Sequence, residues 1–330
     1  MFNIFIPKEI KDGESRVGLI PEAVEELIKI DPEKIKIWIQ EGAGEASGYK
    51  DKDYQAVGAY ILYESFKSIF EEKIDLIIKV KEPLPKEYDF LLSGKKSVAG
   101  FFHFPANPGL EKFFKDNGIR FLDYGEVTDE KGGRPILAAM SKIAGELAVL
   151  KGFNYLLITG CGLMPQDTKV TIIGAGTAGI AAANYAANLG VKKVNISIFD
   201  IKEKMVFVGG QFINTKISSR ENISDILPQT DLLICAPAIK GEQAPKIITR
   251  KMVQSMQKTA VIIDVSIDQG GTLETSKPTT VNSPCYFEEG VLHYCRPNIP
   301  GMVGKSSSRA LSNAALPYLK KFIESFLRTS

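Results

Sequence analysis

Histidine and cysteine are scarce in this 330-residue chain. Histidine occurs only at His103 and His293, which argues against a histidine-rich metal centre. The four cysteines lack the paired spacing of metal ligands and are too few for a disulfide framework. They are Cys161, Cys235, Cys285 and Cys295. We therefore expect no metal site, and a reducing compartment, the cytoplasm.

The chain also lacks an excess of either charge and any long apolar run. Its 41 Lys and Arg against 39 Asp and Glu give a net charge of +2, which offers no electrostatic case for nucleic acid or membrane binding. No apolar run approaches membrane-spanning length, and the first residues lack the apolar stretch of a signal peptide. The expected partner is a small molecule, with no nucleic acid and no membrane.

Length and the order of expected elements indicate an α/β protein of two domains. At 330 residues the chain exceeds the size at which one hydrophobic core usually stops growing. Strand-like and helix-like segments alternate in its first part, and this rhythm usually builds a parallel sheet. The expected strands are 2–6, 36–40, 74–80, 97–102 and 120–122, and the expected helices are 21–30 and 110–117. Turn-forming residues at 128–135 mark a domain boundary.

A long helix and a complete βαβ unit follow this boundary. Apolar spacing predicts the helix at 141–158. Strand 170–173, a glycine-rich loop, helix 180–189 and strand 194–199 form the βαβ unit. Strands 232–235 and 260–265 extend its sheet, and residues 307–327 form one or two helices.

The loop of this βαβ unit reads Gly174-Ala175-Gly176-Thr177-Ala178-Gly179. The pattern alone is a weak signal, but its place between a strand and a helix predicts dinucleotide binding. Gly174 allows the tight turn, Gly176 the approach of the pyrophosphate, and Gly179 the packing of helix on strand. The helix start, at Thr177 and Ala178, would offer N–H groups to the phosphates. The alternative is a tight turn without a ligand.

Asp200 ends the second strand of the unit, about 20 residues after Gly179. A carboxylate at this place accepts hydrogen bonds from the ribose hydroxyls and repels a 2′-phosphate, so NAD is favoured over NADP. Lys202 and Lys204 weaken this preference if they approach a 2′-phosphate. The alternative is that Asp200 caps a helix.

Polar residues outside the glycine loop point to substrate chemistry. Arg16 could hold a carboxylate, although a surface arginine is the plainer interpretation. Lys79 and Lys81 end an apolar strand and are expected on one strand face, either toward a ligand crevice or as a polar strand end. His103 could serve as a general acid or base, or be a core histidine. Asp268 follows an apolar strand and is either a site residue or a turn former.

Several further segments match those of a known protein family, in the same order, along nearly the whole chain. They are 7–9, 16–18, 80–83, 140–145, the glycine loop, 244–246, 267–271 and 278–280. With them the sequence resembles the alanine dehydrogenase and pyridine-nucleotide transhydrogenase family. The resemblance implies two Rossmann-like domains with parallel sheets, the dinucleotide domain being inserted into a discontinuous substrate domain. Expected boundaries are 1–137 with 304–330 for the substrate (catalytic) domain, and 138–303 for the NAD-binding Rossmann domain.

The resemblance also implies roles for single residues. Arg16 and Lys81 match substrate-binding positions, and Lys81, His103 and Asp268 match catalytic positions. Positions that contact the NAD cofactor are matched by Ser141, Asp200 and Asn298. The transhydrogenase branch generally lacks the lysine and histidine pair, so this pair favours an amino-acid dehydrogenase.

The leading hypothesis is reversible, NAD-dependent oxidative deamination of a small L-amino acid, first of all L-alanine to pyruvate and ammonia. The expected state is a homo-oligomer, a dimer or higher. Segment 159–165 is shorter than the glycine-rich stretch usual in alanine dehydrogenases. Segment 104–108 is similar to the transhydrogenase version, and segments 122–124 and 128–132 are similar to saccharopine-forming reductases. Two alternatives therefore stay open: a saccharopine-like, opine-like or other amino-acid dehydrogenase of the same fold, and a non-catalytic NAD-binding subunit of the transhydrogenase kind. Turnover on amino acids is expected of a dehydrogenase but not of the transhydrogenase-like subunit.

Overall fold

The computed structural model describes residues 1–63, 74–92, 96–104, 107–238 and 243–328. The chain divides into two compact units, Met1–Met140 with Gly301–Ser330, and Ser141–Pro300. We call them the terminal unit and the central unit. The sequence places the boundaries at 137 and 304, and this division falls at 140 and 301.

The terminal unit is built on a six-stranded sheet in the order β3-β2-β1-β4-β5-β6, with parallel pairing between neighbours. The strands are β1 (Phe2–Ile6), β2 (Ile35–Gln40), β3 (Tyr60–Leu62), β4 (Leu76–Lys81), β5 (Ser97–Phe101) and β6 (Phe121–Asp123). The strand order reverses between β1 and β4. In open parallel sheets, ligands bind at the carboxyl ends of the strands near such a reversal.

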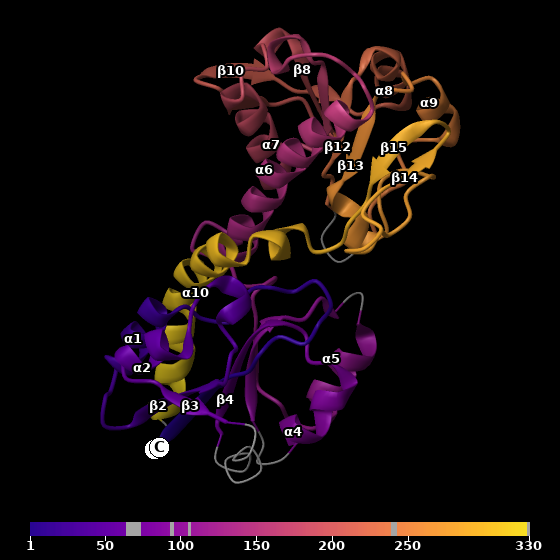
Figure 1. The fold of residues 1–330 in the computed structure, drawn as a ribbon. Helices are drawn as coiled ribbons and strands as arrows, with labels where there is room; N and C mark the ends of the chain where they lie inside the picture. The colour runs from indigo at the N-terminus through magenta and orange to yellow at the C-terminus, as the bar shows by residue number, and fades with distance from the viewer. Residues whose placement is uncertain (64–73, 93–95, 105–106, 239–242, 329–330) are drawn as a thin grey trace. The chain divides into compact units, whose positions relative to one another are not determined.

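Helices cover both faces of this sheet (Figure 1). The helices are α1 (Pro21–Ile28), α2 (Asp51–Ala56), α4 (Tyr88–Leu92), α5 (Pro108–Asp116) and α10 (Gly304–Leu327), with the 3₁₀ turns η1 (Glu45–Ser47) and η4 (Pro85–Glu87). Helices α1, α2 and α10 lie on one side, and α4 and α5 on the other. Side chains alternate along β1, so Phe5 packs in a cluster with Leu91 of α4 and Phe114 of α5, while its buried neighbours Ile4 and Ile6 face the opposite side.

The central unit contains a seven-stranded sheet in the order β11-β8-β7-β12-β13-β15-β14. The strands are β7 (Val170–Ile173), β8 (Ile196–Asp200), β11 (Lys216–Ile217), β12 (Leu232–Cys235), β13 (Val261–Asp264), β14 (Tyr286–Glu288) and β15 (Val291–Tyr294). All pairs are parallel except β14–β15, which is antiparallel. Strands β9 (Met205–Val208) and β10 (Gln211–Asn214) form a separate antiparallel hairpin. Here too the order reverses, between β7 and β12.

Both faces of the central sheet are also covered. The helices are α6 (Pro135–Ile158), α7 (Thr177–Asn188), α8 (Arg220–Ile226) and α9 (Arg250–Gln254), with the 3₁₀ helices η6 (Pro165–Asp167), η7 (Lys193–Asn195), η8 (Leu227–Gln229), η9 (Val265–Gln269) and η10 (Ile299–Val303). Ile223 of α8 and Val253 of α9 pack in one cluster with Leu233 of β12. Leu232, the preceding residue of β12, closely approaches Gly152 of α6, which places α6 on the opposite face. The predicted α/β class with parallel sheets is confirmed.

The expected helices all have somewhat different bounds in the structure. The helix expected at 141–158 begins at Pro135, because proline suits the first helical position as well as a turn. The segment 307–327 lies within one continuous helix, α10.

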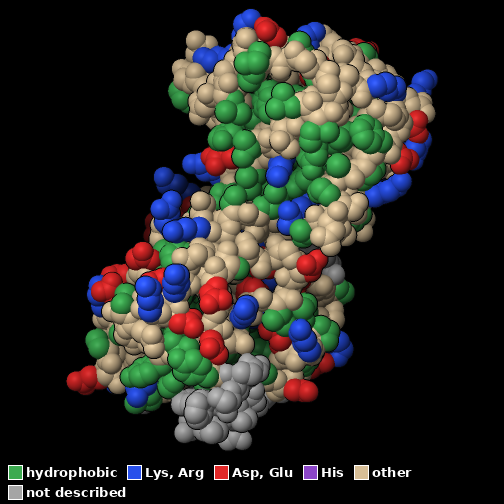
Figure 2. Space-filling view, viewed as in Figure 1, with side chains coloured by type: hydrophobic (Ala, Val, Ile, Leu, Met, Phe, Trp, Pro, Cys, Tyr) green, Lys and Arg blue, Asp and Glu red, His purple; other side chains and the backbone are tan. Residues whose placement is uncertain are grey.

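On the face drawn in Figure 2, acidic and basic side chains are interspersed over the terminal unit.

The described helices include none with both the length and the apolar character needed to cross a membrane.

Candidate active site

Arg16 is buried in the loop that follows β1 and is only 3% exposed. Its Nε donates to Glu14 Oε1 at 2.7 Å and its Nη2 to Glu14 Oε2 at 2.5 Å, while Nη1 lies 3.2 Å from the sulfur of Met140. The Glu14 side chain is fully buried as well. This two-pronged contact fixes the guanidinium plane. The interpretation of Arg16 as a surface arginine is wrong.

Helix α10 holds the loop that carries Arg16. The N–H of Val17 donates to Ser308 Oγ and the N–H of Ile20 to Ser312 Oγ, both at 3.0 Å. Ser308 and Ser312 are four residues apart, so they lie on one face of the helix, and both are fully buried. A segment near the C-terminus therefore orients a residue near the N-terminus.

Lys81 ends β4 and is 7% exposed. Its backbone pairs with Phe101 of β5, and the register between these strands shifts between Ile78 and Lys81. Strict alternation of side chains does not carry across such a shift. The expectation that Lys79 and Lys81 share one strand face therefore loses its basis.

Lys79 is held by ion pairs in the interior. Its Nζ lies 2.8 Å from Glu87 Oε1 and 3.6 Å from Glu9 Oε2, and the Lys79 side chain is 2% exposed. Burial alone lowers the pKa of Lys79, but the carboxylates of Glu9 and Glu87 outweigh it and raise that pKa above the ordinary value. Burial also raises the pKa of Glu9. Lys79 lowers that pKa, but this single cation is shared with Glu87 and offsets the effect of burial only in part.

His103 follows β5 and is exposed, so the interpretation as a core histidine is wrong. Its backbone φ is +50°, in the left-handed region that non-glycine residues seldom adopt outside functional or strained sites. Its ring stacks on Phe101, with centroids 6.0 Å apart. Because Lys81 pairs with Phe101, Lys81 and His103 lie at the carboxyl ends of neighbouring strands. The Arg16 loop reaches the same edge, where Gly18 lies against the Ile78 carbonyl.

In the central unit, the glycine loop has the geometry that a pyrophosphate requires. Gly174 has φ +95°, and a Cβ there would lie 2.7 Å from Pro237 N; a Cβ on Gly179 would clash with the Gly174 carbonyl. A Cβ on Gly176 would meet nothing within 4 Å, so space is open at this position. Helix α7 begins at Thr177, and no side chain of the described residues caps it. Open space beside uncapped N–H groups fits the phosphates of a dinucleotide.

Asp200 lies at the end of β8 and binds the glycine loop instead of capping a helix. Its Oδ2 accepts from the N–H of Ala175 at 3.3 Å and its Oδ1 from the N–H of Ile201 at 2.7 Å. Lys204 Nζ lies 2.6 Å from Asp200 Oδ2. Lys204, one of the two lysines that weakened the preference for NAD, is thus paired with Asp200, the residue that supported it.

Asp268 and Asn298 lie together in the central unit. Asp268 is exposed in η9 after β13, and its Oδ2 accepts from the N–H of Asn298 at 3.2 Å. Asn298 follows β15, the parallel neighbour of β13, and has φ +58°. Ser141 is half-buried on α6.

Sequence reasoning missed the acid that shapes the Asp268 loop. Asp264 is fully buried; its Oδ1 accepts from Ser266 N at 3.0 Å and its Oδ2 from Thr272 N at 2.8 Å. Burial raises the pKa of Asp264, and these hydrogen bonds act against that rise. Lys246 Nζ donates to the Gly270 carbonyl at 2.7 Å. An acid ending an otherwise apolar strand was the available signal for Asp264, and the available signal for Glu14 was its place two residues before Arg16.

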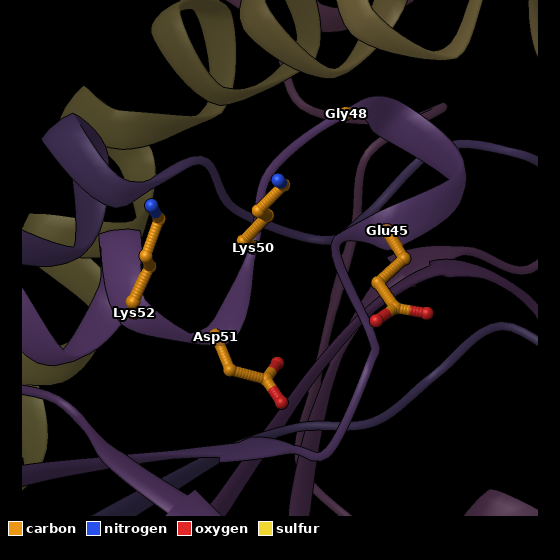
Figure 3. A pocket seen from close by; sticks show the side chains of 5 residues that line it. All are labelled: Glu45, Gly48, Lys50, Asp51 and Lys52. Carbon is orange, nitrogen blue, oxygen red and sulfur yellow. The ribbon is translucent and has the colours of Figure 1, made fainter.

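A surface hollow of about 600 Å³ lies elsewhere in the terminal unit (Figure 3). Its lining consists of Glu45, Gly48, Lys50, Asp51 and Lys52. The Asp51 carboxylate accepts from the N–H of Gly42 at 3.0 Å and so serves the local turn. None of the predicted site residues lines this hollow, and we assign it no role.

Each sheet thus places predicted site residues at the carboxyl ends of its strands, and the central unit has a dinucleotide loop. These features define a two-domain α/β protein that binds a pyridine nucleotide. The chain belongs to the alanine dehydrogenase/PNT family: the family's N-terminal domain matches residues 5–144 and its C-terminal domain residues 144–329. The resemblance stated from the sequence is confirmed.

Similar proteins match nearly the whole of this chain. The alanine dehydrogenase of Bacillus subtilis is 37% identical over 329 residues, spanning 96% of this chain and 84% of that protein. That of Halomonas elongata is 36% identical over 330 residues, spanning 96% and 86%. An L-alanine dehydrogenase structure has a TM-score of 0.85 at 33% identity, covering 99% of this chain and 91% of the other. A transhydrogenase from Sinorhizobium meliloti, at 21% identity, shares the fold with a TM-score of 0.79 and coverage of 98% and 94%.

Proposed function

We propose that the chain catalyses reversible, NAD-dependent oxidative deamination of a small L-amino acid, L-alanine to pyruvate and ammonia. Relatives named alanine dehydrogenase, at 36 to 37% identity over 96% of the chain, support this proposal. The observation that carries it is the buried, Glu14-oriented Arg16 on the same sheet edge as Lys81 and His103. A module that only bound a nucleotide would have no use for this set.

In this proposal the substrate carboxylate binds Arg16, whose orientation is set before the substrate arrives. Glu14 fixes the guanidinium plane, and a rigid planar fork matches a carboxylate better than a flexible ammonium does. Lys81 binds the carboxylate or the oxygen of the 2-oxo acid and stabilises negative charge that develops there.

His103 transfers protons as the imine forms and hydrolyses, and Asp268 serves the water or the ammonia in that step. An exposed imidazole after a strand end has access to substrate and solvent. Its left-handed backbone and its stacking on Phe101 restrict the orientations of the ring. The Asp264 and Lys246 contacts likewise fix the loop that carries Asp268.

The glycine loop from Gly174 to Gly179, with Thr177 and Ala178 at the start of α7, would hold the pyrophosphate. Asp200 would bind the adenosine ribose, which favours NAD over NADP, and Ser141 and Asn298 would make further cofactor contacts. When bound, NAD supplies the hydride chemistry, and the protein supplies orientation and proton transfer.

We also propose a homo-oligomer in the cytoplasm. The end of α6 exposes two large apolar side chains, Leu157 at 76% and Ile158 at 65%, and such surface is typical of subunit interfaces. The four cysteines are all free, in keeping with a reducing compartment. Light scattering on the purified protein measures the assembly directly.

The test is a panel in which NAD and NADP reduction is measured with the common L-amino acids and with saccharopine-like secondary amines. We expect L-alanine with NAD to give the highest kcat/KM. Preference for a secondary amine would favour the opine-like alternative. Nucleotide binding without turnover on any amino acid would favour the transhydrogenase-like subunit.

A further inference from the structure

The end of β4 contains an irregularity directly before Lys81. Ile78 pairs with Ala99 and Lys81 with Phe101, so three steps along β4 match two along β5. One extra residue therefore lies in β4, as in a β-bulge, and a bulge leaves backbone groups outside the ladder. The N–H of Val80 lies in this stretch and needs an acceptor in a buried environment.

Glu9 supplies this acceptor through its side chain. Pairing between β1 and β4 covers Ile4 with Leu76 and Phe5 with Ile77, and β1 ends at Ile6. Beyond that point Glu9 Oε1 accepts from the N–H of Val80 at 2.6 Å, and the Glu9 side chain is only 2% exposed. A carboxylate oxygen thus replaces the missing strand partner one residue before Lys81.

A network of charges anchors Glu9 in turn. Its second oxygen lies 3.6 Å from Lys79 Nζ, and Lys79 donates to Glu87 at 2.8 Å. Glu87 also accepts from the N–H of Leu84 at 2.8 Å. The network therefore holds the backbone on both sides of Lys81. Without these contacts, little would fix the backbone at this irregular end of β4.

We propose that Glu9 is a positioning residue that acts through Lys81: its acceptor oxygen fixes the Val80 peptide and thereby the direction of the Lys81 side chain toward the substrate. This inference rests on the proposed function, in which Lys81 binds the 2-oxo acid. Glu9 itself does not touch the substrate.

Substitutions of Glu9 separate the effects of its side-chain length, its charge and its hydrogen-bond acceptor. Glu9→Asp keeps the charge but is too short to reach Val80, and Glu9→Met has no strong acceptor. Glu9→Gln keeps an acceptor oxygen at the same reach. The readout is the Kd of pyruvate for the enzyme with NADH bound, followed by nucleotide fluorescence. We expect Glu9→Asp and Glu9→Met to weaken pyruvate binding about tenfold, and Glu9→Gln to stay within about threefold of the unmodified protein.

Asp75→Leu is the matched control, because Asp75 Oδ2 accepts from the N–H of Asn3 at 2.8 Å just before β4 begins. It should lower the melting temperature without changing the pyruvate Kd. All variants should bind NADH as the unmodified protein does, since the glycine loop lies in the other unit.

A double-mutant cycle with Lys81→Met decides between positioning and general support. If Glu9 acts through Lys81, Glu9→Asp adds less than about twofold to the pyruvate Kd of the Lys81→Met protein. Equal effects of Glu9→Asp in both backgrounds, or no effect in either, overturn the positioning role. A Lys81→Met protein with an unchanged pyruvate Kd instead overturns the role of Lys81 in the proposed function.

Discussion

The buried cations Arg16 and Lys79 are paired with carboxylates, and these pairs fix the directions of the two side chains. Arg16 is held by Glu14, Lys79 by Glu9 and Glu87, and an isolated charge in such surroundings would be strongly unfavourable. Arg16, Lys81 and His103 could be named from the sequence through the family resemblance, because the residues alone left plainer interpretations open. The contact of Glu9 with Val80 could not be predicted, since the two residues are 71 positions apart in the chain.

Arg16→Lys tests the orienting contact with Glu14. An ammonium group makes one point contact where the guanidinium makes two, so the substrate carboxylate loses a fixed partner. We expect the KM for the amino acid to rise roughly tenfold or more, with a smaller fall in kcat. A fall in kcat with unchanged KM would exclude a binding role, and a melting temperature close to that of the unmodified protein confirms that the variant is folded.

We expect cofactor choice to be set at Asp200 and to be modulated by Lys204. Asp200→Ala should narrow the affinity gap between NAD and NADP by about 1 to 2 kcal/mol, the scale of a lost charged hydrogen bond. Lys204→Ala should widen the gap, because Lys204 Nζ partly neutralises Asp200 at 2.6 Å. Lys202→Ala, an exposed neighbour, is the control and should change nothing. Equal affinity of the unmodified protein for both nucleotides would contradict the assignment.

At the scale of elements, apolar runs located the buried strands well. The predicted strands 2–6, 170–173 and 232–235 have the same bounds in the structure. The hairpin β9–β10 was missed because exposed Met205 and Phe207 hide the alternation between its faces. The edge strand β3, with three residues, is too short to show a pattern. Pro135 was assigned to a turn and instead begins α6.

Helix α10 contributes to the site through its buried serines, and Ser308→Ala tests this contribution. The change leaves the buried N–H of Val17 without its acceptor and also removes the 2.9 Å contact with Ser47. We expect the free energy of unfolding to fall by about 1 to 2 kcal/mol and the KM for the amino acid to rise. Ser306→Ala, on the exposed face of the same helix, should do neither. An unchanged KM in a destabilised Ser308→Ala protein would limit Ser308 to stability.

At the scale of the whole molecule, we expect stability to depend on pH through His293, which is fully buried. Nδ1 faces the Val291 carbonyl at 2.9 Å and Nε2 the Thr275 hydroxyl at 2.9 Å, so the neutral ring with the proton on Nδ1 fits both partners. Burial lowers the pKa of His293 below its ordinary value of 6.5. As the pH falls through that ordinary value, the unfolded chain gains a proton that the folded protein resists, and stability is lost.

We therefore expect His293→Gln, which keeps polar partners but does not titrate, to lose less free energy of unfolding than the unmodified protein between about pH 8 and pH 5. Denaturant unfolding at several pH values measures this difference. Buried acids such as Asp264 contribute equally to both proteins and cancel. Parallel pH profiles for the two proteins would rule out His293 as the source.

The central claim for the whole molecule is that its two units together carry out reductive amination. A test of this claim must exclude a competing reaction, because a nucleotide-binding protein of related fold could also reduce pyruvate directly to lactate. His103→Ala tests the proton-transfer step. We expect kcat to fall roughly 10²- to 10⁴-fold, the usual contribution of a positioned acid or base, while NADH binding is retained.

The most direct measurement incubates the protein with pyruvate, NADH and ¹⁵N-labelled ammonium, and follows nucleotide oxidation together with the products. We predict one equivalent of L-alanine for each NADH oxidised, with the label in its amino group, and no NADH oxidation when ammonium is omitted. Formation of lactate, NADH oxidation that does not depend on ammonium, or NADH binding without any product would contradict the account.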